Sequence, residues 1–182
     1  MTLIIIIAVV AVIVLWGVTA YNGFVKADNS VQEAFATVDV YLKKRFDLIP
    51  NLVETVKGYA KHESETLEKV VAARNAVGEA KTTDEKVANE NVLSGTLKSL
   101  FAVAESYPDL KANQSFQDLM GQLKTVEEDI ANSRKYYNAL VKKFNIKCES
   151  FPSSLIAGMF HYQRKQLFEA GEGERENVKV EF

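Results

Sequence analysis

The side chains best suited to bind a transition metal are scarce in this chain. They are two histidines, His62 and His161, and one cysteine, Cys148. A di-iron site in a helical bundle uses Glu-x-x-His pairs, and a zinc-protease helix needs two histidines four residues apart. Tyr59 and Gly158 stand where those glutamates would have to be, and His62 has no second histidine beside it. The sequence therefore predicts no metal site, and it predicts a surface position for His62.

Other catalytic patterns are also missing from the sequence. It contains neither a phosphate-binding glycine loop nor a G-x-S-x-G nucleophile motif. The paired carboxylates Glu127 and Glu128 are consecutive, so on a helix they point about 100° apart and only one can face inward. The net charge is −2, and no basic stripe with interleaved aromatics suggests a nucleic-acid partner. We expect no catalytic residue, no cofactor, no nucleic acid and no enzymatic activity.

Two arginines fall on or beside the apolar stripes of expected helices. Arg45 fills the one gap in the first stripe, and Arg134 lies beside a later one. An unpaired buried guanidinium is very costly, so it needs a carboxylate partner. We expect Glu105 or Glu127 to pair with at least one of these arginines, in a polar layer that fixes the register between helices or subunits. The alternative is that the long arginine side chains extend to water.

An apolar segment at the N-terminus is long enough to cross a bilayer. Between Leu3 and Ala20 a single threonine is polar, and no side chain is charged. With one residue added on each side, the segment reaches about the 20 residues that a transmembrane helix needs. Trp16 and Tyr21 lie toward its C-terminal end, where an interfacial aromatic belt is expected. The sequence predicts a membrane anchor over residues 1–21, with the lipid bilayer as a partner.

A cleaved signal peptide is the competing interpretation, because Val18-Thr19-Ala20 resembles a cleavage site. The apolar run is longer than a usual signal core and no basic residue precedes it, which favours an uncleaved anchor in the cell membrane. Lys26 and Lys43-Lys44-Arg45 follow the anchor, so positive charge favours an outside N-terminus and a cytoplasmic domain. Asp28 opposes this bias, and the orientation stays open.

Helical spacing continues beyond the anchor without a strong turn signal. Apolar residues recur at steps of four and three, as in coiled coils: Val31, Phe35, Val38, Leu42, Ile49, Leu52, Val56 and Tyr59. We expect one helix to reach about Val77 and to stop at Gly78, so that residues 22–77 span roughly 80 Å. Pro50 lies inside this helix. Since the spacing passes through Pro50 and Ile49 is a poor cap, we expect a kink and no break.

A second long helix follows the connection 78–83. Thr82 and Glu85 have the spacing of a capping box at its start, and Pro108 disfavours helix in the residue before it. The second helix is therefore expected to end near Ser106.

A third long helix is expected to begin near Asn113 or Ser115 and to stop before Phe151-Pro152. Ser153 or Ser154 can cap a short fourth helix that extends through Leu167.

The tail, residues 171–182, has a different character. Two glycines and several charges open it, and then Val178, Val180 and Phe182 alternate with charged residues. This alternation indicates either a short strand, whose partner belongs to another copy of the chain, or a disordered tail.

Taken in order along the chain, several segments resemble the LemA family, a group of bacterial single-pass membrane proteins with a bundle of long helices. The segments are Tyr21-Asn22, residues 45–59 (RFDLIPNLVETVKGY), Ala73-Arg74, residues 104–112 (AESYPDLKA), residues 127–131 (EEDIA), residues 134–138 (RKYYN), Phe144-Asn145, Phe151-Pro152 and residues 178–182 (VKVEF). The resemblance implies an antiparallel helical bundle. It brings no agreed reaction and no catalytic residues.

The expected fold is thus all-α, with a transmembrane helix continuous with a long helix of an antiparallel bundle. The expected parts are an anchor, 1–21, a helical bundle domain, 22–170, and a linker with a strand or tail, 171–182. We expect a non-enzymatic scaffold that self-assembles into a homo-oligomer at the membrane. The alternative is a monomeric binding or regulatory module that holds a peptide, a lipid or another membrane protein, with Phe151 to Phe168 as its contact surface.

Overall fold

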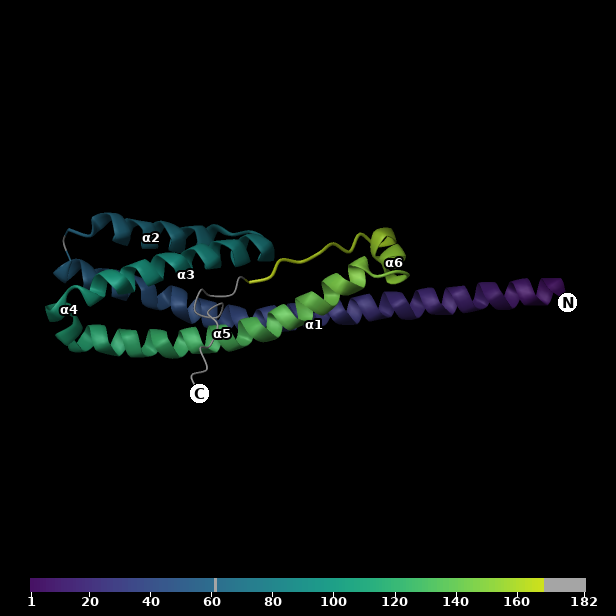
Figure 1. Cartoon of the computed structure of the whole chain (residues 1–182), viewed down its shortest axis with the longest axis horizontal. Coiled ribbons are helices and arrows are strands. Elements are labelled where there is room, and N and C mark those ends of the chain that lie inside the picture. The colour runs from purple at the N-terminus through teal and green to yellow at the C-terminus, as the bar shows by residue number, and fades with distance from the viewer. Residues whose placement is uncertain (61, 169–182) are drawn as a thin grey trace, which may run out of the picture. The chain divides into compact units, whose positions relative to one another are not determined.

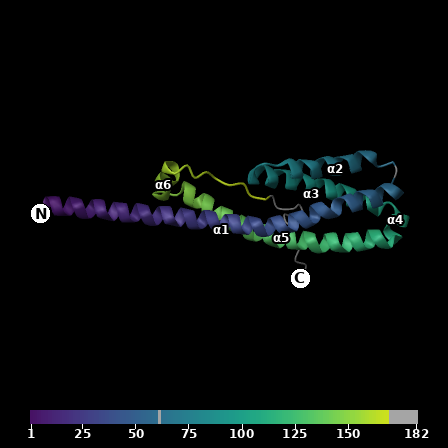
Figure 2. The ribbon, with the colours of Figure 1, turned by 180° about the vertical axis from the view of Figure 1, so that it is seen from behind.

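A computed structural model describes residues 1–60 and 62–168 of the chain. Within these residues the chain forms six α-helices (Figures 1 and 2): α1 Thr2–Tyr59, α2 Ser64–Glu79, α3 Thr83–Glu105, α4 Pro108–Ala112, α5 Gln114–Glu149 and α6 Ser153–Met159. The expected all-α class, with an apolar N-terminal helix that continues into a bundle, is confirmed. The tail with Val178, Val180 and Phe182 lies outside the described residues, and the expected domain limits stay a prediction.

Helix α1 is 58 residues long and passes through Pro50 without a break, as expected. It ends at Tyr59, however, so the expectation of one helix as far as Val77 is wrong. The chain turns after Ala60 and returns as α2. The reason is packing: on α2 the stripe Leu67, Val70, Ala73 and Val77 is buried in the same core as the end of α1. In a straight rod these four side chains would lose that core, and helical periodicity does not register the turn.

The chain forms two compact units. Among the described residues, the second unit comprises Arg45–Thr125 with Leu167 and Phe168, and it holds the end of α1, all of α2, α3 and α4 and the start of α5. Helices α2 and α3 run side by side in opposite directions (Figures 1 and 2). Its core is built from Ile49, Leu52, Val53, Val56, Ala60, Leu67, Val70, Ala73, Val77, Leu93, Leu97, Leu100, Ala104, Leu110, Phe116 and Leu123.

Local signals place the ends of α3 and α5 as expected. The Thr82 hydroxyl accepts the backbone N–H of Glu85 at 3.1 Å, and the Glu85 carboxylate accepts the backbone N–H of Thr82 at 3.3 Å. This reciprocal pair is a capping box, which satisfies N–H groups that the first helical turn leaves free. At α5, the Asn113 side-chain oxygen accepts the backbone N–H of Phe116 at 2.9 Å. Between them, Pro108 starts the short helix α4, which sequence reasoning did not anticipate.

The first unit comprises Met1–Lys44 of α1 and Val126–Gln166, which includes most of α5 and all of α6. Its aromatic cluster joins Phe24 of α1, Phe144 of α5 and Tyr162. The Phe24 and Tyr162 rings stack at 4.9 Å, and Phe144 meets the other two rings edge-on at about 6 Å. Buried Asn145 exchanges two hydrogen bonds with the backbone of Lys165, both at 2.9 Å. These contacts fasten the segment after α6 against α1 and α5.

Helix α6 ends at Met159, earlier than the expected Leu167. His161 adopts a left-handed backbone with φ of 58°, and the N–H of Tyr162 bonds to the carbonyl of Ala157 at 3.0 Å. This pattern is the Schellman termination of a helix. The chain leaves α6 in an extended form, which lets Tyr162 reach the aromatic cluster.

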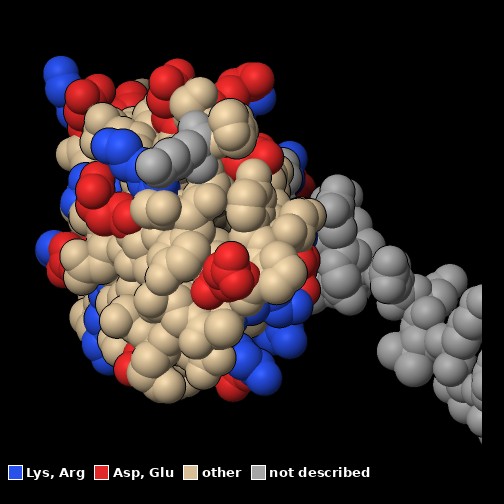
Figure 3. Space-filling view, turned by 90° about the vertical axis from the view of Figure 1, so that its left-hand side faces the viewer, with Lys and Arg blue, Asp and Glu red and all other residues tan. Residues whose placement is uncertain are grey.

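The end of the molecule that carries α4 presents a mixed surface. Uncharged residues occupy most of the face shown in Figure 3, an acidic group lies within it, and basic and acidic side chains alternate around its edge. The electrostatic field of this face therefore has no single sign that would attract an oppositely charged partner.

Candidate functional site

A buried ion pair joins α1 to α3 in the second unit. Arg45 is fully buried, and its Nη2 donates to the Glu90 carboxylate, whose side chain is 1% exposed. Its Nη1 donates to the Ser94 hydroxyl at 2.9 Å, and that hydroxyl donates to the Glu90 carbonyl oxygen at 2.9 Å. The three side chains form a polar layer inside an apolar core. Such a layer fixes the register of two helices, because a shift by one turn would leave two charges buried and unpaired.

The structure pairs Arg45 with an acid that sequence reasoning missed. The expected partners were Glu105 and Glu127, but Glu105 lies on the surface and bonds to Lys111 at 2.5 Å. The missed signal lies in the α3 stripe, in which Val87, Leu93 and Leu97 are buried and Glu90 stands between them. A buried charge on the apolar stripe of one helix needs an opposite charge on the stripe that packs against it.

Arg134 and Glu127, the other members of the expected layer, are half-buried residues of α5 in the first unit. Whether they pair with each other is still a prediction.

Pro50 changes the hydrogen bonding of the α1 backbone four residues earlier. A proline has no N–H, so the carbonyl of Phe46 loses its usual partner within α1. Arg74 of α2 donates its Nε to this carbonyl at 3.1 Å. Its guanidinium also lies 3.8 Å from the centre of the Phe46 ring. The Phe46 ring lies against Gly78 as well, where an added Cβ would be in ordinary contact at 3.5 Å. The proline thus exposes an acceptor that couples α1 to α2.

Two tyrosine contacts tie down the end of the second unit. The Tyr107 hydroxyl donates to Glu63 at 3.2 Å, and Asn113 donates to the Tyr59 hydroxyl at 2.9 Å. Partial burial and the neighbouring Glu63 carboxylate raise the pKa of Tyr107. The phenol therefore keeps its proton, and the hydrogen bond to Glu63, across the physiological pH range.

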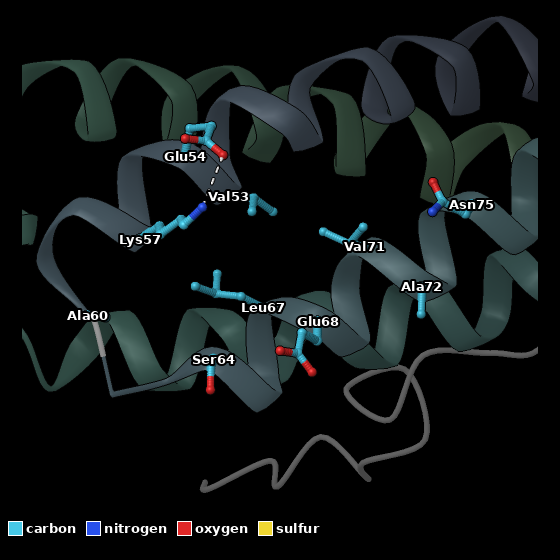
Figure 4. Close-up of a pocket in the computed structure, with 10 residues that line it drawn as sticks. All are labelled: Val53, Glu54, Lys57, Ala60, Ser64, Leu67, Glu68, Val71, Ala72 and Asn75. Atoms are coloured by element: carbon cyan, nitrogen blue, oxygen red, sulfur yellow. Dashed lines mark ion pairs between the residues drawn. The ribbon is translucent and has the colours of Figure 1, made fainter.

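An open pocket of about 490 Å³ lies between the end of α1 and α2 (Figure 4). Val53, Leu67 and Val71 point toward its interior, while Glu54 and Lys57 stand on the α1 side and form an ion pair at 3.9 Å. The remaining lining residues are Ala60, Ser64, Glu68, Ala72 and Asn75. An apolar floor with a charged rim is suited to an amphipathic ligand.

None of the residues suited to metal chemistry is among the lining residues of this pocket. His62 and His161 are exposed, and Cys148 is half-buried near the end of α5. Burial raises the pKa of the Cys148 thiol, so this cysteine stays a thiol at neutral pH. Over residues 1–60 and 62–168, no three His, Cys, Asp or Glu side chains gather closely enough to hold a metal ion.

Comparison with known families identifies the family to which this chain belongs. Residues 34–182 match the LemA family, which is most of the chain. The chain belongs to the LemA family. The signature residues 45–59 hold both architectural features described above, namely Arg45 with its buried partner and Pro50 with its freed carbonyl.

Two kinds of relative accompany the LemA match. Protein LemA of Metamycoplasma hominis is 26% identical over 161 residues, which cover 86% of this chain and 72% of the relative. Magnetosome protein MamQ 2 of Paramagnetospirillum magneticum is 26% identical over 175 residues. MamQ of Magnetospirillum gryphiswaldense is 21% identical over 174 residues. The aligned region covers 82% and 81% of this chain, and it spans 64% of each magnetosome protein, less than two thirds of its length.

The N-terminal part of α1 has the properties of a membrane span. One helix in the described part of the chain is long and apolar enough to cross a bilayer, and its apolar window is exposed throughout. Leu3 and Trp16 are among its exposed apolar side chains. Such a surface needs an apolar environment, which supports a membrane location for this LemA-family chain.

Proposed function

We propose that this chain is a non-enzymatic, membrane-anchored scaffold whose helical bundles assemble into a homo-oligomer at the membrane. One observation carries the proposal: the helix that begins as an apolar, exposed segment continues without a break into the core of the bundle. From residue 22 to Tyr59 this helix projects about 57 Å beyond the anchor. A continuous helix transmits the position and direction of the anchor to the domain, which suits a spacing or assembling role.

The family signature supports an architectural role for the same reason. Arg45 pairs with Glu90 of α3, and Pro50 leaves free the Phe46 carbonyl that Arg74 of α2 binds. Each contact fixes how two helices meet. The magnetosome relatives are proteins of an assembled structure by name, and a role in assembly for this chain is part of the proposal.

The mass of the full-length protein in detergent tests this proposal. The monomer has a mass of 20.3 kDa, so light scattering and electron microscopy separate a monomer from a large regular particle. We expect a regular particle of many copies, and a smaller one after deletion of residues 177–182 if the tail contributes a contact between copies. A monomer both with and without these residues would contradict the scaffold.

The pocket between α1 and α2 favours a second function, a monomeric binding or regulatory module. Its apolar floor and charged rim suit a peptide, a lipid tail or a segment of another membrane protein. The same mass measurement decides between the two functions, because a monomer leaves this pocket open to a partner of another kind.

A further inference from the structure

Exposed apolar side chains gather at the turn between α5 and the segment that follows α6. Phe151 is 82% exposed, Leu155 56%, Met159 71% and Phe160 48%. We call these four residues the turn face. Leu155 and Met159 lie one turn apart on the same side of α6, while Ala157 is buried on the opposite side. Apolar residues clustered in this way, outside the core, mark a surface that meets something apolar.

Contacts within the first unit place the turn face level with the end of the apolar segment. Phe160 lies 4.5 Å from Tyr21, measured between ring centres, and Tyr21 is the last residue of the expected anchor. The segment after α6 then follows α1 away from the span: Tyr162 stacks on Phe24, and Lys165 pairs with Asp28 at 2.9 Å. These three contacts follow one another along α1, and the contact of Phe160 is the one nearest the apolar segment. Helix α6 directly precedes Phe160, so it lies at that end of the series.

The C-terminal part of α5 contacts the same part of α1. Phe144 of α5 meets Phe24, and the Lys147 ammonium lies 4.6 Å from the centre of the Phe24 ring and against Gly23. Helix α5 ends two residues later, at Glu149. The Lys147 ammonium is thus about one turn beyond Tyr21. If Tyr21 marks the membrane interface, this cation lies where headgroup phosphates are expected.

We propose that the turn face is an interfacial membrane anchor, which inserts into the boundary between headgroups and acyl chains of the same bilayer that the apolar segment spans. The proposal rests on the proposed membrane anchoring and adds a second contact with the lipid. Short apolar faces of this kind bury to a depth of about 5–10 Å. The arrangement restricts the tilt of the first unit relative to the bilayer, because one side of α1 near Tyr21 is held to the lipid surface through α6.

Tryptophan fluorescence in lipid vesicles tests the proposal, since Trp16 is the chain's single tryptophan. The reporter variant is Trp16→Phe with Met159→Trp. The matched control is Trp16→Phe with Tyr136→Trp, because Tyr136 is also exposed in the first unit. Its neighbour Tyr137 lies beside Phe35, about 21 Å along α1 from Tyr21. All proteins are full-length and are placed in phosphatidylcholine vesicles with brominated acyl chains.

We expect quenching at residue 159 to exceed that at residue 136 by roughly twofold or more, with a shorter emission wavelength. Circular dichroism confirms that both variants keep their helical content. Equal quenching at the two positions, with native Trp16 quenched, would overturn the interfacial anchor and leave the membrane span intact. Native Trp16 without quenching would overturn the span itself. Residue 159 shielded from acrylamide but not quenched by bromine would show that another copy of the chain covers the turn face, which also overturns the proposal.

Discussion

At the scale of single residues, the ion pair between Arg45 and Glu90 specifies the fold more than it stabilises it. Both side chains lie in the core, and moving two charges out of water costs about as much as their attraction returns. Ser94 satisfies a further donor of the guanidinium, which lowers the cost. The consequence is an asymmetry: loss of one partner is severe, while replacement of both is mild.

We therefore expect Glu90→Ala to lower the free energy of unfolding by about 3–5 kcal/mol, because it leaves a buried guanidinium unpaired. The double replacement Arg45→Met with Glu90→Leu is expected to recover most of this loss. Thermal and urea unfolding of the detergent-solubilised protein, followed by circular dichroism, measures both effects.

The matched control for this comparison is Glu128→Ala, which removes an exposed glutamate from α5. It is expected to change stability by less than about 0.5 kcal/mol. If Glu90→Ala proved as mild as the control, the buried pair would not be needed to hold α1 against α3.

The sequence was sufficient to mark Arg45 but not to name its partner. A single stripe shows where a charge interrupts it, and Arg45 was found in this way. Which acid it meets depends on how α3 packs against α1, and that is set by the turn after Ala60. Glu105 is an available acid at the expected end of the second helix, yet it falls at the exposed end of α3. Pairing between helices is a property of the tertiary structure, and a periodicity argument does not contain it.

At the scale of elements, the helix ends were predicted best where local chemistry decides them. The capping box of Thr82 and Glu85 and the stop before Pro108 depend on residues within one turn, so sequence alone revealed them. The end of α1 at Tyr59 depends instead on burial of the α2 stripe by distant residues. Sequence reasoning extended α1 through this point for that reason.

Pro50 has both a local effect on α1 and an effect on the contact between α1 and α2. A proline at this position leaves the Phe46 carbonyl without its helical donor, and the structure supplies a donor from α2, the Nε of Arg74. A helix-interior proline costs about 3 kcal/mol in an isolated helix. The contact with Arg74 offsets part of this cost and turns a defect of α1 into a junction between α1 and α2.

A double-mutant cycle tests this coupling. In Pro50→Ala the new N–H reaches the Phe46 carbonyl within α1, so the hydrogen bond from Arg74 becomes partly redundant. Arg74→Met is therefore expected to cost about 1 kcal/mol more in the native background than in Pro50→Ala. Loss of the contact with the Phe46 ring is common to both backgrounds and cancels. Urea unfolding of the four proteins gives the coupling energy, and additive effects would show that Arg74 acts independently of Pro50.

At the scale of the whole molecule, function depends on which side of the membrane the bundle occupies. Lys26 and then Lys43 and Lys44 follow the apolar segment. Positive charge is retained on the cytoplasmic side, which predicts an outside N-terminus and a cytoplasmic domain. Asp28 opposes this bias, and it pairs with Lys165 in the first unit, so the orientation needs a direct test.

Cysteine labelling tests this orientation in bacterial spheroplasts that express the full chain. In a Cys148→Ser background, Ser99→Cys places a thiol on the exposed side of α3, and Thr2→Cys places one at the start of α1. A membrane-impermeant maleimide is expected to label residue 2 in intact spheroplasts and residue 99 only after permeabilisation. The reverse pattern would place the bundle outside, where a scaffold acts on extracytoplasmic partners. Labelling of both residues in intact spheroplasts would mean that α1 does not cross the membrane, and the continuity of anchor and bundle would then have no role in positioning the domain.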